Sequence, residues 1–549
     1  MELSGQYVTK RLGGLRAARS GHETDWMKIQ EILNPEGDPF IATPTPGVGG
    51  RAKVYDNTGE LASDMLTSAL IGLIVNPATP WMAIRAADDR LMRREDAALW
   101  YDEVTDITLA DFNAPSRGFA TEQFLKFRSL VNYGSAGMFI DEIAGFGARF
   151  DTRPLAELYV AENDDGRVDT VYRVTSMTAR QIVDKFTRAG DDVPQNIRDK
   201  ASKPEGQDER FTLIHATEPR RGRDSRRLDV LNAPFATAYV VEEGNHKIRE
   251  SGYPENPWVF SRWDKRKGSE VYGRGQGHKA RQDVQSLNHT MKLTFAGAAL
   301  AIRPPLQAAH DGVLSPVRMT SAGITQVRAD LFQYPGGGLR PIHSGVNPEF
   351  GEDFAEKQRQ RVENAFFKPL ILKFRDPRMT ATQTLELVQE VNNLIGPMLG
   401  RVRVEDLDPM IQRVFFVNLR QGRYPEPPQV LRDTEFKIEY QSPAETMQKI
   451  ADARAITNTV SVMEPFLLTN PEIIDRVDGD ALFDHTARIF GWPLKTLRSD
   501  RAVAAIRQAR QQAQAAEVAK QDAMAGGEAA AKLLPALQRM QGQQAGEAA

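Results

Sequence analysis

The amino-acid sequence predicts an α+β protein that is predominantly helical and divided into several domains. Its 549 residues are too many for one ordinary hydrophobic core. Residues 274–302 show the period of one long amphipathic helix, whereas residues 138–174 change to the shorter runs that are typical of strands. Segments rich in proline and glycine interrupt the second half of the chain.

Residues 1–272 are expected to form one α+β body. Asp164-Asp165-Gly166 lies between two apolar runs and predicts a β-hairpin, and Thr178 with Gln181 has the spacing of a capping box that opens a short helix to about Phe186. A capping pattern at 56–59 predicts the start of a helix, and Asn76-Pro77 predicts its end. The apolar stripe expected on this helix consists of Leu61, Met65, Leu66, Leu70 and Leu73. The hairpin strands are predicted at 158–161 and 168–174, and two further strands at 211–217 and 236–243.

Two long helices are predicted at 273–302 and 346–367, joined by a small insert at 303–345. About 25 residues of helix in the first give a rod of roughly 38 Å. Such rods, joined by a compact insert, could lie side by side. The first stripe consists of Ala280, Val284, Leu287, Met291, Phe295, Ala298 and Ile302, and the second of Phe350, Phe354, Val362 and Phe366.

A basic segment follows at 368–378. Its prolines at both ends predict a loop, with four basic residues against one acidic residue. A helix is then predicted from Thr380 to Gly422, with a kink at Gly396-Pro397 because proline removes a helical hydrogen bond. Further helices are expected from 444 to about 498. The last 49 residues contain 17 Ala and 9 Gln, a composition that favours a helix with weak packing or a disordered tail.

Composition limits the classes of function. The net formal charge is −3, so extensive tight wrapping of nucleic acid is not expected. The chain has no cysteine, which excludes disulfides, thiol nucleophiles and cysteine metal sites. No apolar run approaches the roughly 20 residues of a membrane span, and the basic start of the chain lacks the apolar core of a secretory signal. We therefore expect a soluble intracellular protein.

No motif predicts catalysis. Gly273-Arg274-Gly275-Gln276-Gly277 lacks the spacing of a dinucleotide fingerprint or a P-loop, and a flexible lead into the long helix is the better interpretation. The eight histidines show no metal-binding spacing. Basic clusters at 220–227 and 262–267 are more typical of solvated loops or subunit contacts than of nucleic-acid sites. The sequence thus predicts no catalytic residue, no cofactor and no metal.

In their order along the chain, several short motifs resemble the head-to-tail connector, or portal, protein of short-tailed bacteriophages. The likeness covers roughly residues 20–500. It rests on 26–35, 55–59, Pro80-Trp81, Tyr133-Gly134, Arg262-Trp263, 272–275, Leu287-Asn288, Pro304-Pro305, Ala365-Phe366, 380–382, 396–401 and Tyr424-Pro425.

This resemblance implies a ring of twelve subunits at one capsid vertex, through which double-stranded DNA is packaged and ejected. It implies a portal fold with a wing at 1–272, stem helices at 273–302 and 346–367, and a clip at 303–345. A tunnel loop at 368–379, a kinked wing helix and strand at 380–443, a crown at 444–500 and a barrel helix or tail at 501–549 complete it. In that fold the tunnel loop faces DNA, with Lys368, Lys373, Arg375 and Arg378 as the expected contacts.

The resemblance also implies the partners and the location. The partners are the terminase large subunit, the major capsid and scaffolding proteins, and the tail adaptor or tail tube proteins. The protein is expected in the virion, and in the host cytoplasm during assembly. Two alternatives remain open: another structural virion component, such as a tail adaptor or internal core protein, and a DNA-packaging enzyme such as a nuclease or ATPase.

Overall fold

The computed structural model describes residues 3–37, 40, 54–76, 79–187, 190–224, 226–227, 229–266, 270–302, 306–308, 329–330, 339–341, 348–373, 390, 396–431, 434–440, 459, 478–489 and 502–520. The chain divides into two compact units. The larger comprises residues 1–84, 103–426 and 438–447, and the smaller comprises residues 85–102, 427–437 and 448–549. Each unit is described by itself.

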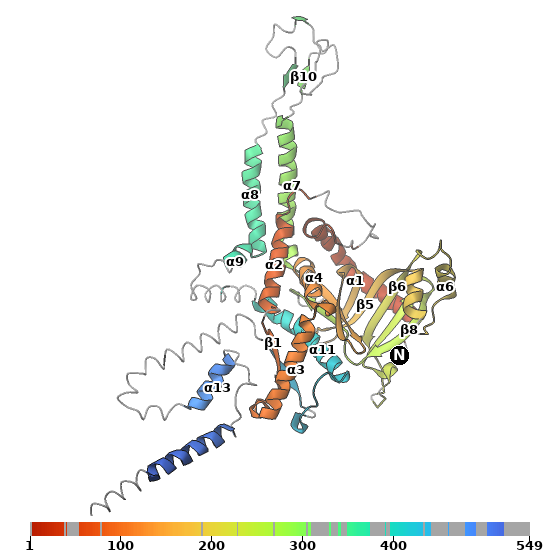
Figure 1. The fold of residues 1–549 in the computed structure, drawn as a ribbon. Helices are drawn as coiled ribbons and strands as arrows, with labels where there is room; N and C mark the ends of the chain where they lie inside the picture. The colour runs from red at the N-terminus through yellow and green to blue at the C-terminus, as the bar shows by residue number, and fades with distance from the viewer. Residues whose placement is uncertain are drawn as a thin grey trace, which may run out of the picture. The chain divides into compact units, whose positions relative to one another are not determined.

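The larger unit contains a five-stranded antiparallel sheet in which neighbouring strands are consecutive in the chain (Figure 1). The predicted hairpin is confirmed, because β4 pairs with β5 around a turn in which Gly166 has φ of 76°. The predicted strands at 211–217 and 236–243 are confirmed as β6 and β7. The strands are β4 (Leu158–Glu162), β5 (Val168–Thr178), β6 (Arg210–Pro219), β7 (Phe235–Val241) and β8 (His246–Tyr253).

Helices cover both faces of this sheet. Helix α1 (Gly5–Leu33) packs Val8, Leu12 and Leu15 on the face that carries Ile214 and Ala216. Helices α5 (Ala179–Phe186) and α6 (Gln195–Ala201) pack on the face that carries Leu213. Alternation along β6 therefore supplies two cores. The predicted capping box is confirmed: Thr178 Oγ1 accepts from Gln181 N, and Gln181 Oε1 accepts from Thr178 N.

A second, three-stranded antiparallel sheet has the order β3 (Gly147–Arg153), β2 (Ser135–Ile143) and β9 (Trp258–Arg262). Helix α4 (Phe119–Tyr133) leads into it and ends at Gly134, whose φ is 77°. Helix α2 (Thr58–Ile74) lies near the predicted position. Its stripe differs from the prediction, because Leu61 is exposed and Ala62 with Ser63 is buried instead. The buried face follows what packs against the helix, and small residues allow a closer approach.

The long helix pair consists of α7 (Gln276–Ile302) and α8 (Pro348–Ala365), which lie side by side and antiparallel (Figure 1). Strands β10 (Leu306–Ala308) and β11 (Leu339–Pro341) pair within the insert. After the short helix α9 (Lys368–Lys373), residues 396–402 are helical, a π-helical turn spans Arg403–Leu407, and α11 spans Asp408–Arg420. The residues before Gly396 that would define the predicted kink lie outside the described residues.

The chain passes from one unit to the other within helix α3 (Glu95–Asn113), strand β1 (Met82–Ala86) and strand β12 (Phe436–Tyr440). Strands β1 and β12 pair with each other. Within the smaller unit, Arg85 pairs with Asp102 at 2.7 Å, and Arg507 pairs with Asp480 of α13 (Gly479–Ile489) at 2.6 Å. Residues 502–520 are helical, and most of their side chains are exposed. Most of the predicted crown and residues 521–549 lie outside the described residues. The short turns are η2 (Leu91–Arg93), η3 (Pro115–Arg117), η4 (Leu155–Glu157), η6 (Val230–Asn232), η7 (Glu243–Asn245) and η10 (Gln429–Leu431).

Candidate functional site

Helix α7 begins in close backbone contact with the end of α4. A Cβ added to Gly273 would lie 2.3 Å from the carbonyl oxygen of Gly134, and one added to Gly275 would lie 2.3 Å from that of Val131. Gly277 approaches Asn132 O equally closely. The predicted flexible lead into the helix is therefore wrong. These glycines allow two main chains to pack directly, and no side chain fits between them.

The first half of α7 is held by polar contacts as well as by its buried stripe. Gly275 N donates to His278 Nδ1 at 3.2 Å, so this imidazole nitrogen is an acceptor. Burial, followed by the positive charge of Arg274, lowers the pKa of His278 to about 4. Arg281 forms an ion pair with Asp25 of α1. Asn288 Oδ1 accepts from Tyr55 N at 2.6 Å.

The face of α8 that meets α7 carries small and polar residues. Ala355, Gln358 and Val362 are buried, and Gln358 Nε2 donates to Ser286 Oγ at 2.8 Å. A Cβ on Gly351 would lie 2.5 Å from Thr294 Oγ1, so the helices touch there. Arg359 pairs with Asp56 at 2.9 Å. Burial raises the pKa of Asp56, but hydrogen bonds from Thr58 and Arg359 outweigh it and leave the pKa below its usual value.

Apolar side chains are exposed at the end of the helix pair formed by the last turns of α7 and the first turns of α8. The predicted stripe of α7 is buried only as far as Met291, and the predicted stripe of α8 is wrong at its start, because Ala355 rather than Phe354 faces inward. Six large apolar side chains of the described residues at this end are between 44 % and 79 % exposed. We call them the distal apolar set: Leu293, Phe295, Leu300, Ile302, Phe350 and Phe354.

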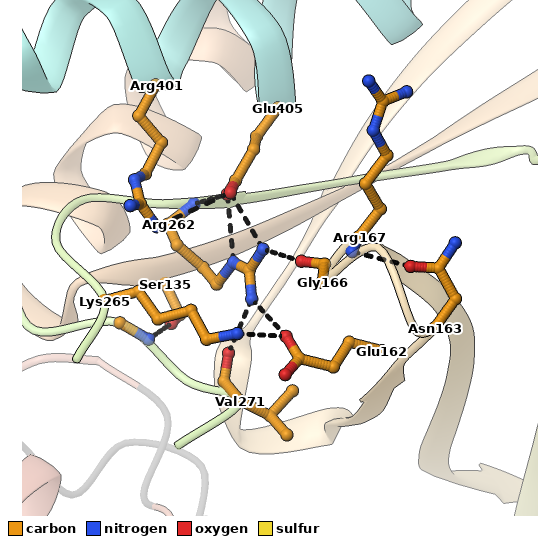
Figure 2. A network of polar contacts seen from close by, with 11 residues as sticks. Ser135, Glu162, Asn163, Gly166, Arg167, Arg262, Lys265, Val271, Arg401 and Glu405 are labelled. Atoms are coloured by element: carbon orange, nitrogen blue, oxygen red, sulfur yellow. Dashed lines mark hydrogen bonds and ion pairs between the residues drawn. The ribbon is translucent and has the colours of Figure 1, made fainter. Parts of the chain in front are cut away.

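An ionic network around the buried Arg262 joins β9, the β4–β5 hairpin and the π-helical turn (Figure 2). Arg262 Nε and Nη2 donate to the two carboxylate oxygens of Glu405 at 3.0 and 2.8 Å, and Nη1 pairs with Glu162 at 2.8 Å. Glu162 also pairs with Lys265. Burial lowers the pKa of Arg262, but the carboxylates of Glu405 and Glu162 outweigh it and raise the pKa. The bidentate geometry fixes the π-helical turn against β9.

The next residue of the same turn makes a second buried pair. Asp406 pairs with Lys126 of α4, both side chains are fully buried, and Gln123 Nε2 donates to Asp406 Oδ2 at 3.1 Å. Burial lowers the pKa of Lys126, although the Asp406 carboxylate opposes this. The π-helical turn thus directs two consecutive acidic residues to two different buried cations. We call Arg262, Lys126, Glu405 and Asp406 the π-turn anchor.

The anchor was not predicted from the sequence. The apolar stripe of the helix predicted from Thr380 to Gly422 steps from Val402 to Leu407, a spacing of five where an α-helix has three or four. One inserted residue in a helix is the feature of a π-bulge, and such bulges occur often at functional positions. That spacing was the available signal. The partners Arg262 and Lys126 lie far away in the chain and had no local signal.

The predicted basic segment is partly helical. Lys368–Lys373 forms α9 rather than the start of a loop, because Pro369 stands in the first helical turn, where proline is tolerated, and Leu370 with Ile371 is buried. Lys368 pairs with Glu363. Lys373 is exposed. Arg375 and Arg378 lie outside the described residues, so the grouping of the four predicted contacts stays a prediction.

The prediction of solvated loops or subunit contacts for the other basic clusters is wrong for the cations that pair within the chain. Arg220 pairs with Glu250 at 2.9 Å, and Arg262 with Lys265 belongs to the network of Figure 2. Within the described ranges, no group of three or more acidic or histidine side chains could hold a metal ion. None of the described helices combines the length and the apolar character needed to cross a membrane.

Comparison with known proteins gives a consistent result. The family model of the bacteriophage head to tail connecting protein matches residues 6–497. The portal protein of Salmonella phage epsilon15 is 28% identical over 542 residues, covering 97% of this chain and 95% of that protein. The probable portal protein of Bordetella phage BPP-1 is 27% identical over 539 residues, covering 96% and 94%. Among solved structures, a chain from the neck of an empty GTA particle, computed with C6 symmetry, is 14% identical and covers 72% of this chain and 84% of its own, with a TM-score of 0.35.

Proposed function

The chain belongs to the bacteriophage head to tail connecting protein family, and from this premise we propose that it is the subunit of a portal ring at one capsid vertex. Double-stranded DNA enters the capsid through the channel of this ring and leaves by it during infection. The two portal relatives match almost the full length of the chain, which supports a role of the whole protein rather than of one module. The role is structural, and the packaging motor is a separate protein.

The observation that carries the ring is the distal apolar set. A single chain leaves six large apolar side chains exposed at one end of the helix pair. Neighbouring exposed apolar residues on a soluble protein mark an interaction surface. In a ring each subunit offers one surface to the neighbour on each side, and closure leaves no free end. We propose twelve subunits, with the helix pair of each packed against the next.

The regions of the chain then have distinct roles. Residues 1–272 form the wing, 273–302 and 346–367 form the stem, and 303–345 form the clip. The clip, at the tip of the helix pair, is the docking place for the terminase large subunit and later for the tail adaptor. The remaining regions are the wing helix and strand at 380–443, the crown at 444–500 and the barrel helix or tail at 501–549, with capsid and scaffolding proteins as further partners.

DNA contact is proposed for the segment 368–379. It follows α8 directly, and a ring repeats each of its cations around the channel. Lys368, Lys373, Arg375 and Arg378 then form sparse positive belts on a chain whose net charge is −3. Each neutralised phosphate adds affinity. A few belts on a nearly neutral wall guide DNA without holding it, as sliding requires.

Native mass spectrometry with negative-stain electron microscopy of the purified full chain tests the ring. We expect closed rings of about 730 kDa, twelve times the 61.2 kDa subunit, with a central channel. Monomers or dimers with folded spectra at micromolar concentration would contradict the proposal. Locating the protein at a single vertex in virions separates a portal from an internal core protein.

DNA contact is tested by replacing Lys373, Arg375 and Arg378 with Gln. We expect intact rings with altered packaging or DNA retention. A matched triple variant of exposed cations far from this segment in sequence, Lys10→Gln with Lys203→Gln and Arg223→Gln, should leave packaging unchanged. Unchanged packaging and retention in the first variant at several salt concentrations would remove the assignment.

A further inference from the structure

A cavity of about 560 Å³ lies on the five-stranded sheet beside α5, on the face opposite α1. Three cations from three different elements line it: Arg153 from the end of β3, Arg173 from β5 and Lys185 from α5. The carboxylate in the lining is that of Asp184. The lining therefore carries three cations and one carboxylate, although the chain as a whole carries a small net negative charge.

The cations have donors left to offer. Arg153 pairs with Asp151, but its Nε is buried and has no hydrogen-bond partner. Arg173 Nε pairs with Glu157 at 2.6 Å, which leaves its other nitrogens for a second acceptor. Lys185 forms no ion pair within the part of the chain that the structure describes. Its ammonium lies over the Tyr239 ring, 4.9 Å from the centroid.

The same cations disfavour one another's charge. Burial, and then repulsion by Arg173, lowers the pKa of Arg153 to about 10. Burial, and then Arg173 and Arg153, lowers the pKa of Lys185. An anion placed among them would relieve this repulsion, because an opposite charge stabilises each cation. Clusters of mutually perturbed groups in a cavity are typical of binding sites.

The wall of the cavity is apolar and aromatic. Tyr239 and His215 stack with their ring centroids 4.3 Å apart, Leu213 and Met177 add apolar surface, and Thr175 and Gln181 also line the cavity. His215 Nε2 is hydrogen-bonded to Thr237 Oγ1 at 2.9 Å, which fixes the ring. An inorganic anion would leave this wall unused. A ligand that fits both parts has an apolar group beside its negative charge.

We propose that Arg153, Arg173 and Lys185 form a binding pocket for an acidic peptide segment in which an apolar side chain stands next to a carboxylate. The carboxylate pairs with Lys185 and the free guanidinium donors, and the apolar side chain covers Tyr239 and Leu213. A cavity of this volume accommodates a few side chains, in the range of small-ligand sites. The segment belongs either to another copy of this chain or to a different protein.

Calorimetric titration of the full chain tests the pocket. The probe is the acetylated, amidated tetrapeptide Phe-Glu-Asp-Leu, and its uncharged counterpart is Phe-Gln-Asn-Leu. We expect binding of the acidic peptide, weaker binding of the counterpart, and a loss of about tenfold in Lys185→Gln and in Arg173→Gln, the effect of removing one charge-assisted hydrogen bond. Arg180→Gln, an exposed cation of α5 outside the lining, is the matched control and should bind as the wild type does.

Equal affinity in Lys185→Gln and the wild type, or no binding of the acidic peptide, would overturn the pocket. Inorganic phosphate binding more tightly than the peptide would overturn the choice of ligand. Loss of assembly in Lys185→Gln at an unchanged unfolding temperature assigns the peptide to a neighbouring copy. Intact rings with lost peptide binding assign it to a different protein. Because the pocket lies away from the helix pair, its failure would leave the proposed ring untouched.

Discussion

The π-turn anchor and the distal apolar set reverse the usual distribution of side chains in opposite ways. The anchor holds four charged residues inside one chain, three of them buried and Glu405 partly buried, and each charge has a partner. The distal set exposes six large apolar residues that lie outside the core formed by the described residues. The anchor is complete in one subunit, whereas we propose that other subunits of the ring cover the distal set.

The difference separates two kinds of stability. Buried ion pairs hold one geometry, because removing either partner leaves an isolated charge in a medium of low dielectric constant. An exposed apolar surface adds no stability until another surface covers it. Its contribution to the free energy of association then grows with the apolar area removed from water. We expect changes at the anchor to affect the folding of the subunit, and changes at the distal set to affect assembly.

The largest effect is expected at Asp406. Replacing it with Ala leaves the Lys126 ammonium fully buried without a counter-charge, which should lower the free energy of unfolding by about 4 kcal/mol. Urea denaturation measures this change. The double variant Asp406→Ala with Lys126→Met removes both charges and should recover much of the loss. A change below about 1 kcal/mol in Asp406→Ala would show that the anchor does not hold the subunit.

The start of α7 should make stability depend on pH. The pKa of His278 is about 4 in the folded chain against an ordinary value of 6.5, so the unfolded chain binds a proton that the folded chain does not between these values. Stability is therefore full above pH 6.5 and is lost as the pH falls towards 4. The charged and titratable groups that act on His278 are Arg274, Asp25, His22 and Arg281.

His278→Asn tests this dependence, since Asn keeps an acceptor for Gly275 N but does not titrate. We expect the loss of unfolding free energy between pH 7 and pH 4.5 to be about 2 kcal/mol smaller in the variant than in the wild type. His289→Gln, on the exposed side of α7, is the control. Identical pH profiles for His278→Asn and the wild type would contradict the assignment.

Changes in the distal set should weaken assembly and leave the folding of the subunit unchanged. Phe350→Ser with Phe354→Ser removes apolar area that other subunits cover, so rings should dissociate at concentrations at least about tenfold higher than in the wild type. The unfolding temperature of the isolated subunit should stay the same. Val230→Ser with Leu231→Ser, equally exposed but outside the helix pair, is the matched control. Sedimentation velocity measures assembly, and equal ring stability in both double variants would count against the interface.

The smallest effect is expected at α9. Lys368 and Glu363 form a partly exposed pair, so Lys368→Gln should lower the free energy of unfolding by only about 0.5 kcal/mol. Lys373→Gln should leave unfolding unchanged and alter DNA retention, because Lys373 is exposed. Urea denaturation and retention of packaged DNA at several salt concentrations separate the two. A larger loss of stability in Lys373→Gln than in Lys368→Gln would reverse this assignment.

Local patterns were enough to predict much of the larger unit. The turn at Gly166, the capping box of Thr178 and Gln181, and the position of α7 all depend on residues within a few positions of one another. Family membership was also within reach, because it rests on short motifs in a fixed order along the chain. These features need no knowledge of what packs against them.

Tertiary structure decided the rest. Glu405 meets Arg262 across 143 residues, and no local pattern can name such a partner. Phe350 and Ala355 both fit an apolar face of α8, and only the close approach of α7 at Gly351 places Ala355 inside and leaves Phe350 in solvent. Lys368–Lys373 became helical because Leu370 and Ile371 found a core to enter. A sequence determines which faces can be buried, but the neighbouring element determines which one is, since burial is a property of two surfaces.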